Sequence, residues 1–226
     1  MDLLNKVAIV TGGSRGIGAG VVDKFAIHGA KIIIADISLD ESETFADKLI
    51  KKGHDVYAFQ TDVTKIDSVE SMVSETIKRF KTIDILVNNA GVWAAPGFVN
   101  RTLSEPEDWD ITFEVNLKAV ATVTNAVVPH MKNNSYGKII NIASAGGLVG
   151  RDRRMYERNN KEQQPIDYAA AKSGVIGMTM DLAGLLTPMG VHVNAISPGG
   201  FDKGDLSDGF VKDFGDMTMA GRMGRM

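Results

Sequence analysis

Cysteine is absent from this chain of 226 residues. Disulfide bridges, thiolate metal sites and a cysteine nucleophile are therefore excluded. Basic residues are not in excess either, because 25 Lys and Arg stand against 28 Asp and Glu, a formal net charge of −3. Nucleic acids and anionic membranes bind basic surfaces, so we expect neither as a partner. Long apolar runs are also missing, and no membrane helix is expected.

A secretory leader is lacking at the N-terminus. The first six residues, MDLLNK, run directly into the apolar stretch 7–10, without a charged segment and a cleavable apolar region. We therefore expect a cytoplasmic protein. The four histidines are scattered along the chain, which predicts no metal site: His28, His54, His130 and His192.

Short apolar runs alternate with longer amphipathic stretches along the chain. Six runs rich in β-branched residues are predicted to be strands: 7–10, 31–37, 55–63, 83–91, 137–144 and 191–200. Helical spacing lies between them, as in 68–80, where apolar residues share one face. The alternation predicts an α/β fold with a doubly wound parallel sheet covered on both faces. No linker marks a second domain, so residues 1–226 are predicted to form a single domain.

A glycine-rich segment, TGGSRGIG, follows the first predicted strand and places Gly12, Gly16 and Gly18 before a helix. Glycine permits a tight turn and the close approach of a diphosphate, and a helix N-terminus offers free N–H groups. The spacing differs from G-x-G-x-x-G, and glycine also punctuates ordinary strand–helix turns. A cofactor loop and a plain turn both remain open at this point.

Asp36 closes the second predicted strand, 18 residues after Gly18. A carboxylate at about this distance accepts hydrogen bonds from the ribose of a dinucleotide. It would repel a 2′-phosphate, which predicts NAD rather than NADP. Arg15 can pair with a 2′-phosphate and argues the other way, but we expect the repulsion at Asp36 to outweigh it. The structural alternative is an ordinary aspartate that caps a turn.

Tyr168 and Lys172 are four residues apart in YAAAK and share one helical face. A phenol titrates near pH 10, and a nearby ammonium group lowers its pKa, as general acid–base catalysis requires. Ser144 ends the strand 137–144, at the edge where open α/β sheets bind ligands, and can hold a substrate oxygen there. The alternatives are a surface tyrosine with a solvated lysine, and a serine that caps a helix.

Seven segments occur together in one order: TGGSRGIG, Asp62-Val63, NNAG (88–91), Asn116 in FEVNLKA, Ser144, YAAAK and SPGG (197–200). This set resembles the short-chain dehydrogenase/reductase family and extends over nearly the whole chain. The resemblance implies a Rossmann fold with a seven-stranded parallel sheet. It also implies hydride transfer between a nicotinamide and a carbonyl or secondary alcohol, in a homodimer or homotetramer.

The resemblance assigns a role to each residue of the set. Tyr168 would be the acid/base, Ser144 would position the substrate oxygen, and Asn116 would anchor a water of the proton relay. Lys172 would lower the pKa of Tyr168 and hold the nicotinamide ribose. The residues implied to bind the cofactor are Gly12, Ser14, Arg15, Gly16, Ile17, Gly18, Asp36, Asp62, Val63, Asn89, Ala90, Gly91, Tyr168, Lys172, Pro198 and Gly199.

The resemblance also assigns some of these residues to particular parts of the cofactor. Asp62 and Val63 would flank the adenine, Asn89 to Gly91 would line the cofactor near the sheet, and Pro198 and Gly199 would close over the nicotinamide. A partly structural role for the NNAG segment is also open, with Asn88 and Asn89 tying neighbouring strands together.

Two segments depart from the family pattern. Ser144 and Tyr168 are separated by 24 residues, wider than usual, because of the polar segment 151–165, which we predict to be an inserted loop at the rim of the active site. One of its arginines would contact a polar or anionic substrate, unless the segment is only a solvated excursion. Residues 201–226 are predicted to be a substrate lid with a truncated end, so that the last strand of the sheet is missing.

The sequence therefore predicts an oxidoreductase that uses NAD(H) and a small secondary alcohol or ketone, such as a sugar, a polyol or another polar or anionic substrate. One alternative is a 3-oxoacyl-thioester reductase that uses NADPH. The other is a non-catalytic nucleotide-binding scaffold.

Overall fold

The computed structural model describes residues 3–93, 106–202, 204 and 206–225. In it the six β-branched runs form one parallel sheet with the strand order β3-β2-β1-β4-β5-β6. The strands are β1 Val7–Thr11, β2 Lys31–Asp36, β3 Val56–Gln60, β4 Ile85–Asn88, β5 Gly137–Ile142 and β6 Val191–Ile196. Each strand lies within a predicted run, except that β1 also includes Thr11, and β2, β3, β4, β5 and β6 are shorter than the runs that predicted them.

Helices connect successive strands or extend beyond the sheet. The α-helices are α1 Gly16–Ile27, α2 Leu39–Ile50, α3 Ile66–Phe80, α4 Pro106–Phe113, α5 Ala119–Asn133, α6 Arg154–Arg158, α7 Ile166–Leu186 and α8 Asp208–Asp216. Three shorter turns carry the labels η1 Glu114–Lys118 (a π-helix), η2 Ala145–Gly147 and η3 Thr187–Met189. None of the helices described is long and apolar enough to cross a membrane.

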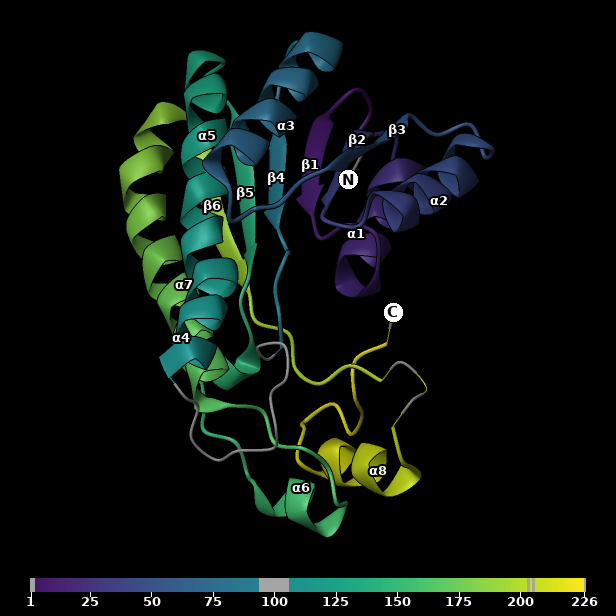
Figure 1. The fold of residues 1–226 in the computed structure, drawn as a ribbon, viewed down its shortest axis with the longest axis vertical. Helices are drawn as coiled ribbons and strands as arrows, with labels where there is room; N and C mark the ends of the chain where they lie inside the picture. The colour runs from purple at the N-terminus through teal and green to yellow at the C-terminus, as the bar shows by residue number, and fades with distance from the viewer. Residues whose placement is uncertain (1–2, 94–105, 203, 205, 226) are drawn as a thin grey trace.

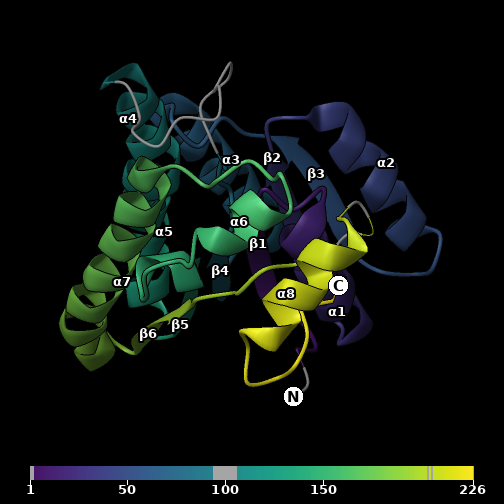
Figure 2. The same cartoon turned by 90° about the horizontal axis from the view of Figure 1, so that it is seen from below.

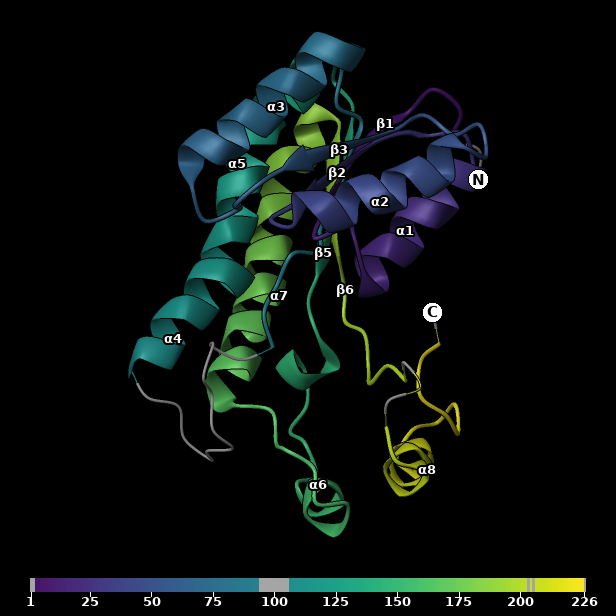
Figure 3. The same ribbon diagram turned by 45° about the vertical axis from the view of Figure 1, so that its right-hand side comes forward.

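The sheet is the middle of three layers. Buried side chains of α3, α5 and α7 pack on one face, and those of α1 and α2 pack on the other (Figures 1 and 3). The central strands β1, β2 and β4 are almost wholly buried, which explains why their sequences are nearly uninterrupted apolar runs. The predicted fold class, a doubly wound Rossmann-type α/β domain, is confirmed.

The strand order reverses between β1 and β4, since β1, β2 and β3 extend to one side and β4, β5 and β6 to the other. Open α/β sheets bind ligands at the carboxyl ends of the strands beside such a reversal. Among the described residues the sheet has six strands, one fewer than the family resemblance implies. At its β6 edge the side chains of His192, Asn194 and Ile196 are exposed.

Two short helices lie beyond the carboxyl ends of the strands, where α6 and α8 contact each other (Figures 1 and 2). Met155, Phe210 and Met223 form a small apolar core between them. Asp213 accepts hydrogen bonds from Arg158 Nε at 3.3 Å and from Asn159 Nδ2 at 2.9 Å. We call α6 and α8 with these contacts the α6–α8 layer. It joins the segments 151–165 and 201–225, which are distant in the sequence.

A network of buried amide and hydroxyl side chains joins β4 and β5 to the helices on one face of the sheet. Asn88 Nδ2 donates to Thr124 Oγ1 at 3.0 Å and to Asn141 Oδ1 at 2.9 Å, and Asn141 Nδ2 donates to Thr179 Oγ1 at 2.9 Å. These bonds link β4, β5, α5 and α7. A buried polar group is costly without a partner, so each member depends on the others.

Replacing Asn141 by alanine tests this network. We expect Asn141→Ala to lower the free energy of unfolding by about 2 kcal/mol, because it removes two buried hydrogen bonds and leaves the Asn88 amide short of an acceptor. Urea unfolding followed by circular dichroism measures the change. The control is Asn134→Ala, which removes an exposed bond to Thr82 and should cost about 0.5 kcal/mol or less. Equal losses in the two variants would contradict the prediction.

Candidate active site

The loop between β1 and α1 depends on its glycines. Gly12 and Gly16 have φ of +61° and +57°, a left-handed conformation that favours glycine. At Gly18 a Cβ atom would lie 2.1 Å from the carbonyl oxygen of Gly12 and 2.5 Å from Asn89 Nδ2. The backbone thus requires glycine at all three positions, for two different reasons.

The N-terminus of α1 is left open for an anion. Arg15 is the N-cap residue, its side chain makes no capping bond, and the first turn holds no acidic residue. A Cβ atom on Gly16 would meet nothing within 4 Å, so the loop is open on that side. Free N–H groups and the positive end of the helix dipole suit a phosphate. The residues present therefore fit the diphosphate of a dinucleotide.

Thr11 and Asn89 tie the end of β1 to the end of β4. Asn89 Nδ2 donates to the carbonyl oxygens of Thr11 at 3.0 Å and Gly12 at 2.8 Å. Thr11 Oγ1 in turn accepts from the backbone N–H groups of Asn89 and Ala90 at 3.0 and 3.1 Å. Thr11 was not among the predicted site residues. The signal that points to it is a hydroxyl side chain closing an otherwise apolar, fully buried strand.

Asp36 is bound to the glycine loop rather than free in solvent. Its Oδ2 atom accepts from Ser14 N at 3.1 Å and Ser14 Oγ at 2.7 Å, and Oδ1 accepts from Ser38 N at 3.2 Å. Nearby, Arg15 Nη1 lies 3.6 Å from Glu41 Oε2, with both side chains exposed. The predicted carboxylate and arginine therefore both lie beside the loop, and each already has partners in the protein.

The predicted adenine-side residues, Asp62 and Val63, follow the end of β3. Asp62 Oδ1 accepts from Thr64 N at 2.9 Å and from Thr64 Oγ1 at 2.6 Å, which fixes the turn after the strand. Val63 is buried against the core. Ile17, a predicted cofactor-binding residue on α1, is half-buried.

Asn116 lies in the π-helical turn η1, fully buried. Its Oδ1 atom accepts from Val92 N at 3.0 Å, and its Nδ2 atom donates to Val92 O at 2.9 Å. A Cβ atom on Gly91 would lie 2.6 Å from Asn116 Oδ1, so these two predicted residues are in close contact. Asn116 therefore holds the segment that follows β4 against the helix.

Ser144, Tyr168 and Lys172 meet at the carboxyl end of β5. Ser144 Oγ accepts from Gly146 N at 3.1 Å, and its side chain makes a hydrogen bond with Tyr168. Lys172 Nζ donates to the carbonyl oxygen of Ile142 at 2.7 Å and lies 5.8 Å from the centre of the Tyr168 ring. The backbone of Pro198 also reaches this end, where its carbonyl oxygen accepts from Ala145 N at 2.9 Å, and the exposed Gly199 follows it.

Burial opposes the charged forms of both titratable groups. It raises the pKa of Tyr168, and it lowers the pKa of Lys172 to about 8. The hydrogen bond from Ser144 and the positive charge of Arg151 lower the pKa of Tyr168 against this effect. Burial outweighs both groups, so the pKa of Tyr168 stays above its ordinary value. The lowering expected from Lys172 stays a prediction.

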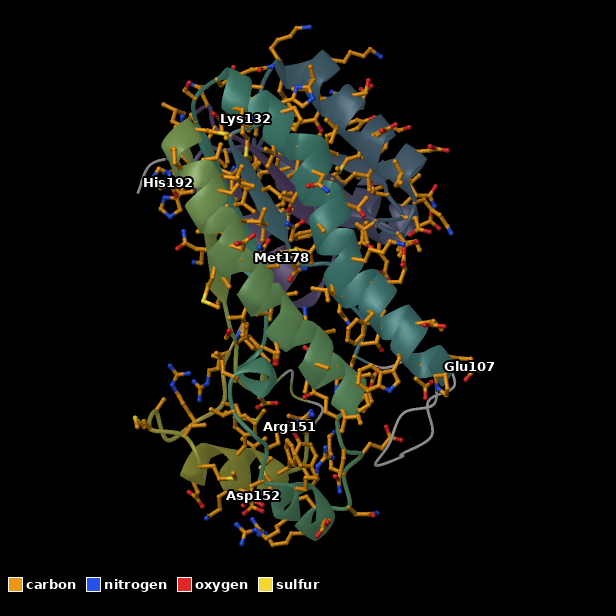
Figure 4. All side chains as sticks on the ribbon, turned by 90° about the vertical axis from the view of Figure 1, so that its left-hand side faces the viewer. Glu107, Lys132, Arg151, Asp152, Met178 and His192 are labelled. Carbon is orange, nitrogen blue, oxygen red and sulfur yellow. The ribbon has the colours of Figure 1, made fainter. Side chains whose placement is uncertain are left out.

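The arginines of segment 151–165 differ in their surroundings. Arg154 is exposed and makes two hydrogen bonds to Asp152, at 2.9 and 2.7 Å. Arg153 Nη1 donates to Gln163 Oε1 at 2.6 Å. Arg151 lies between the end of α7 and the α6–α8 layer, with Asp152 farther out (Figure 4). Of the predicted basic residues, Arg151 is the one whose charge acts on Tyr168.

Comparison with known proteins settles the family. The sequence profile described as short chain dehydrogenase matches residues 6–213. This chain belongs to the short-chain dehydrogenases. The predicted family is thus confirmed, and with it an NAD(P)-dependent oxidoreductase that acts on a secondary alcohol or ketone and uses a nicotinamide cofactor.

Individual short-chain dehydrogenases are similar to this chain over most of their own length. The (2S)-[(R)-hydroxy(phenyl)methyl]succinyl-CoA dehydrogenase subunit BbsD of Thauera aromatica is 40% identical over 88% of this chain and 74% of its own. The 3-oxoacyl-[acyl-carrier-protein] reductase FabG of Staphylococcus epidermidis is 33% identical over 96% and 83%. The crystal structure of gox2181 matches with a TM-score of 0.84 at 29% identity, over 99% of this chain and 85% of that one.

Alanine at Gly18 tests the need for glycine in this short-chain dehydrogenase. The added methyl group meets the rigid carbonyl of Gly12, so we expect the loop to open and the affinity for NADH to fall about tenfold or more, as the loss of one charge-assisted hydrogen bond predicts. Fluorescence titration with NADH measures the change.

The matched control is Gly20→Ala on the same helix. A Cβ atom there meets nothing within 4 Å. We expect an unchanged affinity for NADH and a gain in stability of about 0.5–1 kcal/mol, since alanine favours a helix over glycine. Normal NADH binding by the Gly18→Ala variant would contradict the prediction, because it would show that the contact with the Gly12 carbonyl does not control the affinity for NADH.

Proposed function

We propose that this chain transfers a hydride between NAD(H) and a small, polar or anionic secondary alcohol or ketone. The observation that carries the proposal is the contact of Ser144 with Tyr168 at the carboxyl end of β5, one helical turn from the buried Lys172. A hydroxyl group, a phenol and an amine brought together at the ligand-binding edge of a Rossmann sheet suit proton transfer to or from an alcohol.

The cofactor preference rests on the charges beside the glycine loop. Asp36 is held against the loop by Ser14. Glu41 adds a second carboxylate and partly neutralises Arg15, the residue that can bind a 2′-phosphate. Two negative charges and a paired arginine disfavour NADP, which supports NAD.

The cofactor would lie along the carboxyl ends of β1 and β4 and reach the end of β5. The loop glycines and the first turn of α1 would hold its diphosphate, and Asp36 its adenosine ribose. The other residues proposed to line it are Ser14, Arg15, Ile17, Asp62, Val63, Asn89, Ala90, Gly91, Lys172, Pro198 and Gly199. The bound nicotinamide supplies the acceptor or donor of the hydride.

Proton transfer is the task of the chain's own residues. During oxidation the Tyr168 phenolate oxygen takes the proton from a substrate hydroxyl held by Ser144, and during reduction the phenol returns it to the substrate oxygen. The Ser144 hydrogen bond and the Arg151 charge favour the phenolate, whereas burial opposes it. With a pKa of about 8, Lys172 is mostly protonated at neutral pH and adds positive charge on the same side. Asn116, fixed by Val92, would anchor a water that passes the proton to solvent.

The α6–α8 layer would form the substrate side of the site. Segment 151–165 supplies the rim that follows Ser144, and residues 201–226 supply the lid, since α8 packs on α6. Cytoplasmic location and a homodimeric or homotetrameric assembly remain predictions from the sequence.

The similarity to FabG favours a second candidate, reduction of a 3-oxoacyl thioester with NADPH. The reactive residues would be the same, so the cofactor separates the two proposals. A nucleotide-binding scaffold without turnover is disfavoured, because Ser144, Tyr168, Lys172 and Asn116 are all present and clustered.

Tyr168→Phe tests the chemistry. Removing the acid/base hydroxyl should lower kcat by about 1,000-fold, within the usual range for general acid–base catalysis, while NADH binding changes by less than about twofold. Turnover is followed by NADH absorbance with a panel of sugars, polyols, hydroxy acids and acyl thioesters. The control is Tyr57→Phe, on β3 and beneath Arg79, which should keep full activity. A Tyr168→Phe enzyme with normal kcat would remove this mechanism.

Cofactor choice is tested by titrating the protein with NADH and NADPH. We expect NADH to bind at least about tenfold more tightly, as repulsion of about 1.4 kcal/mol predicts. Glu41→Gln releases Arg15, so NADPH binding should tighten by about threefold, the scale of an exposed charge pair. Glu43→Gln, an exposed change on the same helix, should alter neither affinity. Tighter binding of NADPH by the natural chain would favour the 3-oxoacyl reductase.

A further inference from the structure

The Arg151 side chain lies near Ser144, the serine proposed to hold the substrate oxygen. A Cβ atom built on Gly146 would lie 3.5 Å from Ser144 Oγ, 3.6 Å from Gln164 Oε1 and 3.9 Å from Arg151 Cδ. Three side chains thus converge on one point of η2. Ser144 Oγ, on the serine proposed to hold the substrate oxygen, and Arg151 Cδ therefore both lie within 4 Å of the same point.

Two hydrogen bonds within the protein fix the orientation of the Arg151 guanidinium. Its Nη1 atom donates to Gln164 Oε1, and its Nη2 atom donates to the carbonyl oxygen of Pro165 at 3.2 Å. A guanidinium has five N–H donors, so these bonds fix its orientation and leave donors for a ligand. The side chain is only half-buried, which leaves part of it accessible.

Arg151 also differs from its neighbours in its charge partners. Arg154 forms an ion pair with Asp152, and Arg158 forms one with Asp213. Within the described part of the chain no carboxylate lies within ion-pair distance of Arg151. Asp167 attracts it from farther away, and Arg153 repels it. Its positive charge is therefore only partly compensated at the site.

We propose that Arg151 binds a carboxylate of the substrate while the alcohol carbon lies at Ser144 and Tyr168. The inference rests on the proposed function and specifies its substrate class as hydroxy acids and the corresponding oxo acids. A planar carboxylate accepts two parallel hydrogen bonds from a guanidinium, which a sugar hydroxyl or an amide does not match. Because Arg151 and Ser144 are close, only a few bonds separate the carboxylate from the reacting carbon.

Tyr156 completes this part of the wall. It is half-buried, lies near both Arg151 and Arg153, and packs edge-on against Phe210 with ring centres 5.4 Å apart. The α6–α8 layer thus brings the Tyr156 phenol near enough to interact electrostatically with the guanidinium. The partial burial of this region favours a strong charged hydrogen bond.

The test compares acids with their neutral amides. Three hydroxy acids place the carboxylate at increasing distance from a secondary alcohol: 3-hydroxybutyrate, 4-hydroxypentanoate and 5-hydroxyhexanoate. The primary amide of each has nearly the same shape without the charge. We measure the ratio of kcat/KM for acid over amide, at one pH with NAD, for the natural chain and its Arg151 variants.

The natural chain should prefer the acid by about tenfold or more at the best chain length, the scale of a charged hydrogen bond. In Arg151→Gln the ratio should fall to about one, and in Arg151→Lys to an intermediate value, since the charge stays and the fork is lost. Arg154→Gln, the same change in an arginine paired with Asp152, should keep the natural ratio. The ratio also cancels any change in the pKa of Tyr168, which affects acid and amide alike.

Other outcomes overturn the inference. A ratio near one in the natural chain, an unchanged ratio in Arg151→Gln, or equal loss of acid and amide turnover would each exclude carboxylate binding by Arg151, while amide oxidation that depends on Tyr168 would leave the proposed function standing. If no alcohol of the series is oxidised, the proposed function fails for this class. Calorimetry of the three acids with the NADH complex then decides the role of Arg151, with a tenfold loss of affinity in Arg151→Gln expected and an unchanged affinity contradicting it.

Discussion

The bonds that join the carboxyl ends of β1 and β4 hold the site together. The strand order reverses between these strands, so no loop connects their ends directly. Thr11 and Asn89 connect them instead, and the same amide group holds the carbonyl oxygen of Gly12. That carbonyl lies where a side chain on Gly18 would be, which explains the glycine in α1. The shape of the glycine loop therefore depends on a side chain 77 residues farther along the chain.

The burial of Tyr168 and Lys172 is a second constraint on the site. Tyr168 and Lys172 are placed on a buried stretch of α7, where burial disfavours both charged forms. Proton transfer near neutral pH requires the phenolate to be accessible, so the surroundings must offset burial. Ser144 at the end of β5 and Arg151 beyond η2 both lower the pKa of Tyr168, although burial still outweighs them. The same arginine would then serve substrate binding and acid–base chemistry, because both favour a positive charge at that place.

The inserted segment 151–165 is held in place by contacts with a second segment, around α8. By itself 151–165 is polar and charged, and its short helix α6 buries only Met155. Phe210 and Met223 from the end of the chain cover that side chain, and Asp213 holds the same helix through Arg158 and Asn159. The two segments predicted to be rim and lid thus pack together into one layer, so that a change in either is expected to move the other.

The sequence by itself determined the strands, the fold class, the family and the positions of the glycine loop, because these follow from local patterns: β-branched runs, glycine spacing and a motif order. It also singled out Ser144, Tyr168 and Lys172, which the structure brings together. It left open which of the four arginines of segment 151–165 lies near the site, and it missed Thr11 altogether. Only the tertiary structure decided that Arg151 lies beside Tyr168 while Arg154 pairs with Asp152 in solvent. The physical reason is that the pKa of a side chain and its partners depend on burial and on charges from other elements, and residues adjacent in the sequence can differ completely in both.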